Sequence, residues 1–470
     1  MAKIAVFLDH DIVIRHFVLN DALASIQKEH EVVFVFPHDN KRVRIDLKTL
    51  GLRRVRTIPV SAQRTYLYRR LYHATVLRTM RHTDRRHRRA TMRIWRYLLG
   101  PVPFWKSWLC SWPLTYELYK SRMLRDIGPN DVLDSLLREE CPDIVVHPTV
   151  LEGLFVSDLV RWGEANGKPT VFIMNSWDNP ATKAMLVGLP SRLVVWGEQT
   201  RDHAIRHMNV PPERVIGLGV AQFDLYRNPP METPADYKRR LGVPLGHKVL
   251  LYAGSSNGLN ETNHLLRLEE AVERGELKNC VILYRPHPWR AYPAGEKDYH
   301  SLAWKHVTLD PAMEACYRTS RKKERIHVEL ANYENTHVTL SAVDAVISPL
   351  STILLEAALH GKPVAAYLPN EGIKKNQSVT TRARMIHFLE FFDRVDCIKC
   401  ESPDDLIEDC RRLLQKADDP GIGERLKKQC AYFVEPSNRP YAERLNDLIL
   451  SMVSSPSPES GVPRAESPDR

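Results

Sequence analysis

Short apolar runs of strand length alternate along most of the chain with longer amphipathic stretches. The first cycle consists of an apolar run at residues 3–8, a helix-like stretch at 17–29 and a second apolar run at 31–37. Parallel strands that helices cover on both faces read as continuous Val, Ile, Leu and Phe, and these runs have that composition. The alternation therefore predicts βαβ units and an α/β fold with parallel sheets.

The apolar runs form two series that a polar stretch separates. The first series continues at 143–148, 169–174, 192–197 and 214–219, and the second comprises 248–254, 280–288, 337–340, 345–349 and 363–369. The prolines and polar residues of 226–246 make this stretch the best candidate for a linker. We predict two Rossmann-like, doubly wound domains, 1–235 and 236–453, with a central cleft where the carboxyl ends of both sheets face each other.

Two segments depart from the alternation. Residues 64–96 contain eleven arginines and a single acid, Asp84, and they lead into a stretch rich in tryptophan. We therefore expect a basic, aromatic insertion at 60–125 within the first domain. Residues 454–470 contain many Ser and Pro and no hydrophobic anchor, which is typical of a disordered tail.

The composition is that of a soluble globular chain, with 43% hydrophobic and 26% charged residues. Because 67 Lys and Arg face 57 Asp and Glu, the formal charge of +10 favours anionic partners: nucleotide phosphates, nucleic acid or an acidic membrane face. The apolar run at 4–8 is too short for a signal peptide, and no run approaches the roughly 18 apolar residues of a membrane span. The eight cysteines are scattered, so we expect a reduced, cytoplasmic protein.

Two loops that follow predicted strands of the second half carry residue types that suit a nucleotide diphosphate. Gly254, Ser255 and Ser256 supply close-approaching backbone N–H groups and hydroxyls before a predicted helix, where anions bind readily. Arg285 and His287 lie at the end of the next predicted strand. Each loop also has a purely structural interpretation, because Gly-Ser loops form tight turns and a histidine at a strand end is often satisfied locally.

A third loop precedes another predicted helix. Ser351 and Thr352 lie at its start, where hydroxyls donate to phosphate with the help of the helix dipole, and Glu356 follows one turn later to accept from ribose hydroxyls. A Ser-Thr pair can instead serve only as a helix cap. Because all three loops lie at carboxyl ends of strands in one domain, we predict that they form one nucleotide-binding site.

In the first half, the motif MNSWDNPATKAM follows an apolar run directly and supplies the predicted catalytic groups. Asp178 comes at the carboxyl end of the predicted strand, with Lys183 after it, and a carboxylate placed there can take a proton from an acceptor hydroxyl. The alternative is that Asp178 only forms a turn or an N-cap. His10, in the loop after the first strand, is a further catalytic candidate; other possible bases are Asp11, His16 and Glu152.

We expect neither a metal nor another cofactor. The Asp-His-Asp at 9–11 is similar to the metal-binding motif of another transferase class, but a lone match after the very first strand is most simply chance. Cys397 and Cys400 have the spacing of half a zinc site, and no second pair accompanies them.

These features together resemble a known family. Gly-Ser-Ser at 254–256, His287-Pro288 and the S-T-x-x-x-E-A-x-x-x-G-K-P motif that starts at Ser351 resemble the GT-B glycosyltransferases over roughly residues 140–450. The nearest branch contains CDP-glycerol glycerophosphotransferases of teichoic acid synthesis and bacterial capsule and lipopolysaccharide transferases. The resemblance implies the GT-B fold and phosphate binding by the His-Pro and Ser-Thr elements. In the glycerophosphotransferases a Trp-His-Gly-Thr-Pro-Leu-Lys motif supplies the proposed base, and Asp178 stands in the place of its histidine.

Departures from related patterns narrow the expected activity. Many retaining GT-B enzymes have two glutamates eight positions apart, whereas Ser348 precedes Glu356 at that distance. Nonhydrolysing UDP-N-acetylglucosamine 2-epimerases share the fold but carry Ser-Gly-Gly where this chain has Ser348-Pro349-Leu350. Fold alone does not decide between these functions. The predicted base, Asp178, favours transfer to an acceptor over epimerisation.

We therefore predict an inverting, metal-independent glycosyltransferase of bacterial surface polysaccharide assembly, capsule or lipopolysaccharide. Its partners would be a nucleotide-sugar donor, a glycan or lipid-linked acceptor and the anionic inner face of the plasma membrane, to which it would bind peripherally. One alternative is a CDP-polyol phosphotransferase, which needs the same phosphate site. The other is a nucleic-acid-binding protein that uses the arginine-rich segment, with the α/β halves as a non-catalytic scaffold.

Overall fold

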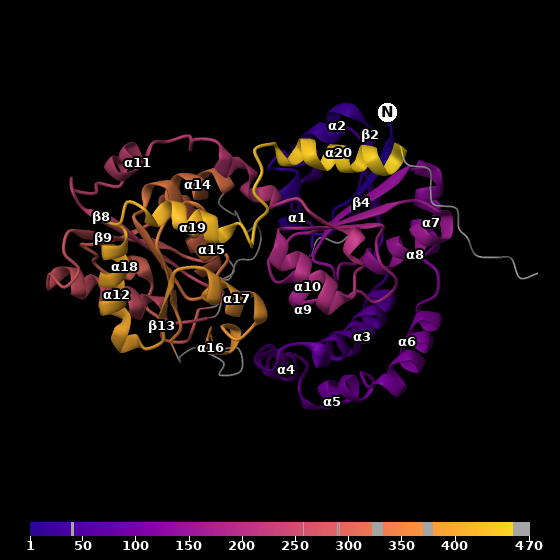
Figure 1. Cartoon of the computed structure of the whole chain (residues 1–470), viewed down its shortest axis with the longest axis horizontal. Coiled ribbons are helices and arrows are strands. Elements are labelled where there is room, and N and C mark those ends of the chain that lie inside the picture. Colours follow the sequence, from indigo (N-terminus) through magenta and orange to yellow (C-terminus); the bar gives the residue numbers. More distant parts are fainter. Residues whose placement is uncertain are drawn as a thin grey trace, which may run out of the picture.

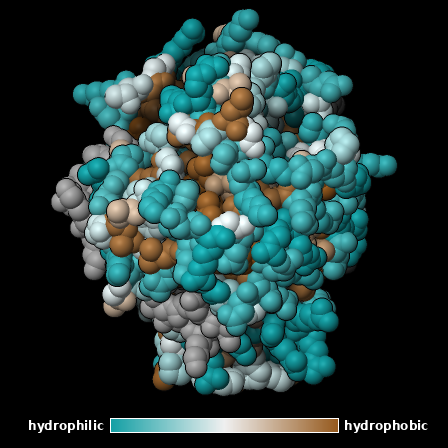
Figure 2. All heavy atoms as spheres, turned by 90° about the vertical axis from the view of Figure 1, so that its left-hand side faces the viewer, coloured by the Kyte–Doolittle hydropathy of each residue, from teal (hydrophilic) through white to brown (hydrophobic). Residues whose placement is uncertain are grey.

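The computed structural model describes residues 1–38, 42–256, 258–288, 290, 292–321, 332–369 and 379–454. Two parallel sheets with helices around them lie side by side, and a group of helices projects from the first (Figure 1). Figure 2, which views the left-hand side of Figure 1, shows a mainly hydrophilic surface on the second domain. The predicted tail from residue 455 onward lies outside the described residues.

The first sheet has seven parallel strands in the order β3-β2-β1-β4-β5-β6-β7. Their bounds are β1 Lys3–Phe7, β2 Glu31–Pro37, β3 Val55–Ile58, β4 Ile144–Thr149, β5 Thr170–Met174, β6 Arg192–Val195 and β7 Val215–Gly217. In the central register Ile4 pairs with Val32 on one side and with Ile144 on the other. The strand order reverses its direction between β1 and β4, which opens a crevice at the carboxyl ends of these strands.

Helices of the first domain are α1 Asp11–Phe17, α2 Ala24–Glu29, α7 Asp131–Glu140, α8 Val156–Asn166, α9 Asn179–Thr182 and α10 Glu198–Met208. The single helix that we expected at 17–29 is therefore wrong. The chain forms α1 earlier and α2 later, and Asp21 between them has φ 54°, a left-handed conformation that interrupts a helix.

The second sheet has six parallel strands in the order β10-β9-β8-β11-β12-β13. Their bounds are β8 Lys248–Ala253, β9 Cys280–Arg285, β10 Val307–Leu309, β11 Ala345–Ser348, β12 Val364–Tyr367 and β13 Cys397–Cys400. Its helices are α11 Pro234–Arg240, α12 Glu261–Glu273, α13 Glu314–Arg321, α14 Tyr333–Ala342, α15 Ile353–Leu359, α16 Val379–Arg382, α17 Ile386–Arg394, α18 Leu406–Lys416 and α19 Ile422–Cys430. The sequence thus predicts the two-sheet architecture correctly.

The strand predicted at 337–340 is wrong, because these residues belong to α14. This helix is buried over most of its surface, so it lacks the polar stripe by which a surface helix is recognised in a sequence. The Thr339 hydroxyl donates to the Asn335 carbonyl at 2.9 Å, and the Asn332 side chain caps the helix by accepting from the Asn335 N–H at 2.8 Å. Side-chain to backbone hydrogen bonds therefore satisfy its polar groups inside the domain.

The last helix, α20 Tyr441–Ser454, crosses back from the second domain to the first (Figure 1). Tyr441, Leu445 and Ile449 are buried in the core on one face of the first sheet. Asn446 completes the attachment, because its Oδ1 lies 3.0 Å from His30 Nε2. We predicted that the second domain ends at residue 453, which assigns α20 to that domain. The structure instead packs α20 on the first domain.

The predicted basic insertion forms four helices between β3 and α7. They are α3 Ala62–Thr79, α4 Arg85–Leu99, α5 Pro101–Leu109 and α6 Pro113–Ile127, and they form the lower margin of the molecule in Figure 1. Leu71, Val76 and Met80 of this group pack with Ala184 and Leu186 of the first domain. None of the helices in the described ranges is long and apolar enough to cross a membrane.

Candidate active site

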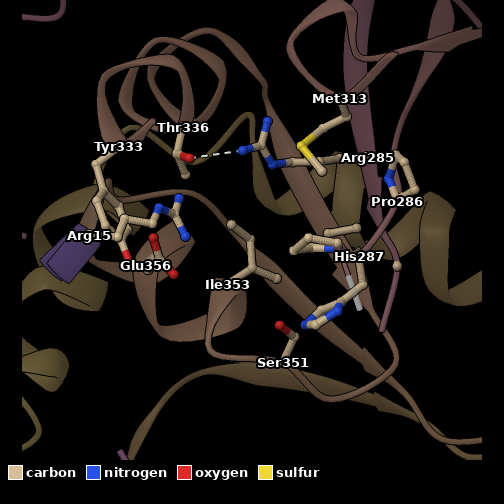
Figure 3. Close-up of a pocket in the computed structure, with 13 residues that line it drawn as sticks. Arg15, Arg285, Pro286, His287, Met313, Tyr333, Thr336, Ser351, Ile353 and Glu356 are labelled. Carbon is tan, nitrogen blue, oxygen red and sulfur yellow. Dashed lines mark hydrogen bonds between the residues drawn. The ribbon is translucent and has the colours of Figure 1, made fainter. Parts of the chain in front are cut away.

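A pocket lies at the carboxyl ends of β8, β9 and β11, and α1 of the first domain closes it from the other side (Figure 3). Of the eight predicted nucleotide-binding residues, five line it: Gly254, Arg285, His287, Ser351 and Glu356. Parallel strands end at one edge of their sheet, which is why loops far apart in the sequence meet here. We call this cavity the donor pocket.

The lining residues outside the predicted set include Arg15, Met313, Tyr333 and Thr336. Arg15 comes from α1 of the first domain, and its guanidinium carbon lies 4.1 Å from the centroid of the Tyr333 ring. In Figure 3, Arg15 and Glu356 lie together at one end of the pocket, and His287 and Ser351 at the other. The charge of Arg15 is visible in the sequence, but nothing there shows that it faces the second domain.

Arg285 is buried and donates to the Asp310 carboxylate and, at 2.8 Å, to Thr336 Oγ1. Burial disfavours its charge, but Asp310 outweighs this effect and raises the pKa of Arg285. The guanidinium therefore remains charged and is held by two partners, one of them a carboxylate. A bound phosphate would meet an oriented donor whose charge Asp310 offsets in part.

His287 is neutral at physiological pH in this site. Burial lowers its pKa to about 4, and the positive charges of Arg382 and Arg290 act in the same direction. A neutral imidazole carries one N–H, so His287 can donate a hydrogen bond to a phosphate oxygen without contributing charge. Its low pKa agrees with a binding role and argues against a role as a general base at neutral pH.

Of the predicted residues in the loop after β8, Gly254 lines the donor pocket. The Ser255 N–H donates to Glu261 Oε1 at 2.9 Å, so this donor is engaged within the protein. Glu261 also accepts from the Tyr284 hydroxyl at 2.8 Å. A Cβ on Gly254 would lie 2.4 Å from Glu261 Oε2, so any larger residue there would have to displace this carboxylate. Ser255 is buried, Ser256 is exposed, and neither lines the donor pocket.

Thr352, the N-cap residue of α15, makes no side-chain cap bond and does not line the donor pocket either. The preceding Leu350 has φ 51°, the left-handed region in which glycine is favoured. This turn directs Ser351, and not Thr352, into the pocket.

Glu356 is oriented by a residue of the segment that joins the domains. The Tyr226 hydroxyl donates to Glu356 Oε2 at 2.6 Å. Burial raises the pKa of Glu356, while Tyr226, Arg15 and Arg285 oppose that rise. The carboxyl group is therefore fixed in place beside the cation of the first domain.

The predicted base, Asp178, lies where the two domains meet and lines no described pocket. It accepts from Ser176 Oγ at 2.8 Å and from Thr182 Oγ1 at 3.1 Å. Burial would raise its pKa, but Lys183 and His387 outweigh burial and hold the pKa of Asp178 below its usual value. The group stays ionised at neutral pH, as a base must, although its hydrogen-bond donors make it a weak one.

The neighbouring Trp177 fixes this loop to the second domain. Its ring centroid lies 5.3 Å from that of Phe388, 5.6 Å from that of Phe391 and 5.9 Å from that of Phe433. The indole Nε1 donates to Gln199 Oε1 at 2.6 Å. Asp178 is thus held at the interface by a buried aromatic cluster that the sequence did not reveal.

Neither a family model nor a curated protein sequence matches the chain. Solved structures match it over nearly its whole length. A Listeria monocytogenes protein assigned as a UDP-N-acetylglucosamine 2-epimerase aligns with 97% of this chain and 98% of its own, at TM-score 0.52 and 13% identity. The chain has the GT-B fold. UGT89C1 of Arabidopsis thaliana, complexed with UDP, covers 96% of this chain and 100% of its own at TM-score 0.50 and 12% identity. The glycotransferase of kitacinnamycin covers 96% and 98% at TM-score 0.50 and 14% identity.

These similarities confirm the predicted fold class. At identities of 12% to 14% they show the fold alone and do not distinguish between the families that share it, so the resemblance to CDP-glycerol transferases remains a prediction. Within the described ranges, no group of three His, Cys, Asp or Glu could hold a metal ion.

A second and larger cavity of this GT-B protein lies between the insertion and the first domain. It has a volume of about 900 Å³ and is lined by α3, the end of α4 and the loops after β3 and β4. Lys183 and Glu152 meet in its wall, with Nζ 2.8 Å from Oε1. We call it the insertion cavity. In this wall Lys183 pairs with Glu152 and not with Asp178. Glu152 is one of the alternative bases that we predicted.

His10 lies apart from both cavities. Its Nδ1 accepts from the Ile12 N–H at 3.1 Å as the N-cap of α1, and burial lowers its pKa despite the nearby Asp9 and Asp11. This position fits a structural cap.

Proposed function

We propose that this protein is a glycosyltransferase that transfers a sugar from a nucleotide-activated donor to a glycan or lipid-linked acceptor. The pathway that we propose is bacterial surface polysaccharide assembly, capsule or lipopolysaccharide. The observation that carries the proposal is the donor pocket, where residues from three strand ends of the second domain and Arg15 of the first domain surround one space. A ligand held there is in contact with both domains, as a donor must be when its acceptor binds to the other domain.

The donor nucleotide would bind through hydrogen bonds and through the positive charges of Arg285 and Arg15. His287 and Ser351 supply neutral donors to the phosphates at one end of the pocket, and Glu356 accepts from ribose hydroxyls at the other. Arg15 supplies positive charge from across the cleft. The Arabidopsis protein of the same fold is complexed with UDP, which supports a uridine nucleotide as the first ligand to test.

In the proposed reaction, a base removes the proton from an acceptor hydroxyl as the oxygen attacks the anomeric carbon and the nucleotide diphosphate leaves. Asp178 is our first candidate for this base, because it is ionised and lies between the domains. Glu152 is the second, because it lines the insertion cavity directly. Arg15 and the N–H of His287 would stabilise the charge on the leaving phosphate, which is why we expect no metal. Because the acceptor oxygen would displace the leaving group directly, the reaction would invert the anomeric configuration.

Calorimetry with UDP, GDP, CDP and CMP tests the donor site and separates the sugar-nucleotide hypothesis from the CDP-polyol alternative. We expect a uridine or guanosine nucleotide to bind, and His287→Ala and Ser351→Ala to weaken that binding by roughly tenfold each, the value of one hydrogen bond to a charged group. Thr352→Ala is the matched control, since this hydroxyl adjoins Ser351 but lies outside the pocket. Preference for a cytidine nucleotide would favour the polyol-phosphate alternative. Equal affinities in all variants would remove the donor-site assignment.

A second candidate function is epimerisation of a UDP-sugar, which the similarity to the Listeria protein favours. Incubation with UDP-N-acetylglucosamine in heavy water separates the two. An epimerase exchanges hydrogen at the sugar C2 without an acceptor, whereas a transferase leaves C2 unlabelled. If the chain is instead a nucleic-acid-binding protein, it should bind nucleic acid in a salt-sensitive way and should not bind nucleotides.

A further inference from the structure

The helical insertion concentrates the positive charge of the whole protein. Residues 62–127 contain 15 Lys and Arg and three acids, whereas the complete chain has a formal charge of only +10. The rest of the chain is therefore slightly acidic. On α4, the exposed Arg85, Arg89, Arg93 and Arg96 recur at helical spacing and share one face. None of these four arginines forms an ion pair in the part of the chain that the structure describes.

The same insertion exposes large apolar side chains in an unusual density. Seven of them are at least partly open to solvent within residues 98–118: Leu98, Val102, Trp105, Leu109, Trp112, Leu114 and Leu118. Leu114 is 90% exposed and Leu118 is 76% exposed. The spacing of the four residues from 102 to 112 places them on one face of α5 and its end, and Leu114 and Leu118 lie one turn apart on α6. We call the six residues from Val102 to Leu118 the apolar patch.

Aromatic residues with a polar atom complete this surface. Trp108 packs edge-on between Trp105 and Trp112, with ring centroids 5.5 Å and 5.1 Å apart. The Arg81 guanidinium lies 4.7 Å from the Trp112 centroid. Indole rings beside arginines suit the boundary between lipid headgroups and acyl chains, where one end of the ring is apolar and the other is wet.

We propose that the outer face of the insertion docks on an anionic phospholipid bilayer, with the apolar patch in the interface and the α4 arginines on the headgroups. Charge decides against a second copy of the chain as the occupant. Two patches in a symmetric contact would bring two strongly positive insertions together. Against anionic lipid, each arginine near the surface instead strengthens binding by about fivefold.

Co-sedimentation of the full-length chain with vesicles tests the docking. We expect sedimentation with equimolar phosphatidylglycerol and phosphatidylcholine at low salt, none with phosphatidylcholine alone, and release as salt rises. Leu114→Ser with Leu118→Ser should lower the partition coefficient at least tenfold. Met231→Ser with Leu245→Ser is the matched control, because these residues of the segment that joins the domains are 73% and 103% exposed and should not change the partition coefficient.

The charge contribution has its own pair of variants. Replacing Arg85, Arg89 and Arg93 by Ser should weaken vesicle binding by about fivefold per residue, and replacing them by Lys should preserve it. Absence of sedimentation at low salt, or equal loss in the Met231/Leu245 control, would overturn the proposal. So would light scattering that shows a dimer which Leu114→Ser with Leu118→Ser dissociates while vesicle binding is unchanged. The vesicle assay contains no nucleotide, so its failure and failure of the donor site are separate results.

Discussion

His87 connects three parts of the molecule, and its protonation state is the basis of a quantitative prediction. It lies on α4 of the insertion and is 0% exposed. Its Nδ1 accepts from the Ile386 N–H of the second domain at 3.0 Å, so the ring proton is on Nε2, which lies 3.1 Å from the Ala181 carbonyl of the first domain. A second proton on Nδ1 would point at the Ile386 N–H, so this hydrogen bond would be lost and two donors would face each other. Acid should therefore weaken the contact between the insertion and the second domain.

The magnitude follows from the pKa. Burial, with a smaller contribution from His207, lowers the pKa of His87 from 6.5 to about 4. Because the folded pKa is the lower one, the contribution of this site is complete above pH 6.5 and is lost as the pH falls towards 4. At pH 5 the unfolded chain is almost fully protonated at this position and the folded chain is not. Linkage then predicts a loss of about 2 kcal/mol from His87, a decrease in Tm of roughly 4–8 °C for a domain of this size.

Thermal unfolding at pH 7.5 and pH 5.0 measures this effect. His87→Asn keeps an acceptor for the Ile386 N–H but does not titrate, so its Tm should fall less between the two pH values than that of the wild type, by the 4–8 °C given above. His82→Asn, at an exposed position of the same insertion, is the control and should behave as the wild type does. Equal pH dependence in all three proteins would refute the argument that burial suppresses protonation of His87.

Three further predictions concern the site. Asp178→Asn should lower the transfer rate by roughly 100- to 10,000-fold with nucleotide affinity unchanged in calorimetry, and a rate within threefold of wild type would transfer the role of base to Glu152. Arg15→Ala should weaken nucleotide binding and make it less sensitive to salt, because it removes a charge across the cleft; unaltered salt dependence would contradict this. Gly254→Ala should reduce both Tm and nucleotide affinity, because its Cβ would lie 2.4 Å from the Glu261 carboxylate; a variant as stable as wild type would show that this loop relaxes freely.

The position of the donor pocket and five of its lining residues could be predicted from the sequence because of a property of parallel sheets. Each strand of the second domain is a buried apolar run, and the residues after such runs must gather at one edge. This is enough to bring Gly254, His287 and Ser351 together. The sequence does not show that Glu261 occupies the N–H of Ser255, since the partner of a backbone group depends on how the loop is packed.

Only the tertiary structure shows the contacts between distant segments, because these contacts leave no pattern in the local sequence. Burial on all sides conceals the helix at 333–342, whose β-branched residues read as a strand. Arg15 is one basic residue among 67 until α1 is placed against the second domain. His87 shows the same limit, because its neutral state depends on Ile386 and Ala181, which are distant in sequence. Periodicity and strand-end chemistry are local properties and can be recognised in the sequence, whereas desolvation and partner choice arise only when the domains meet.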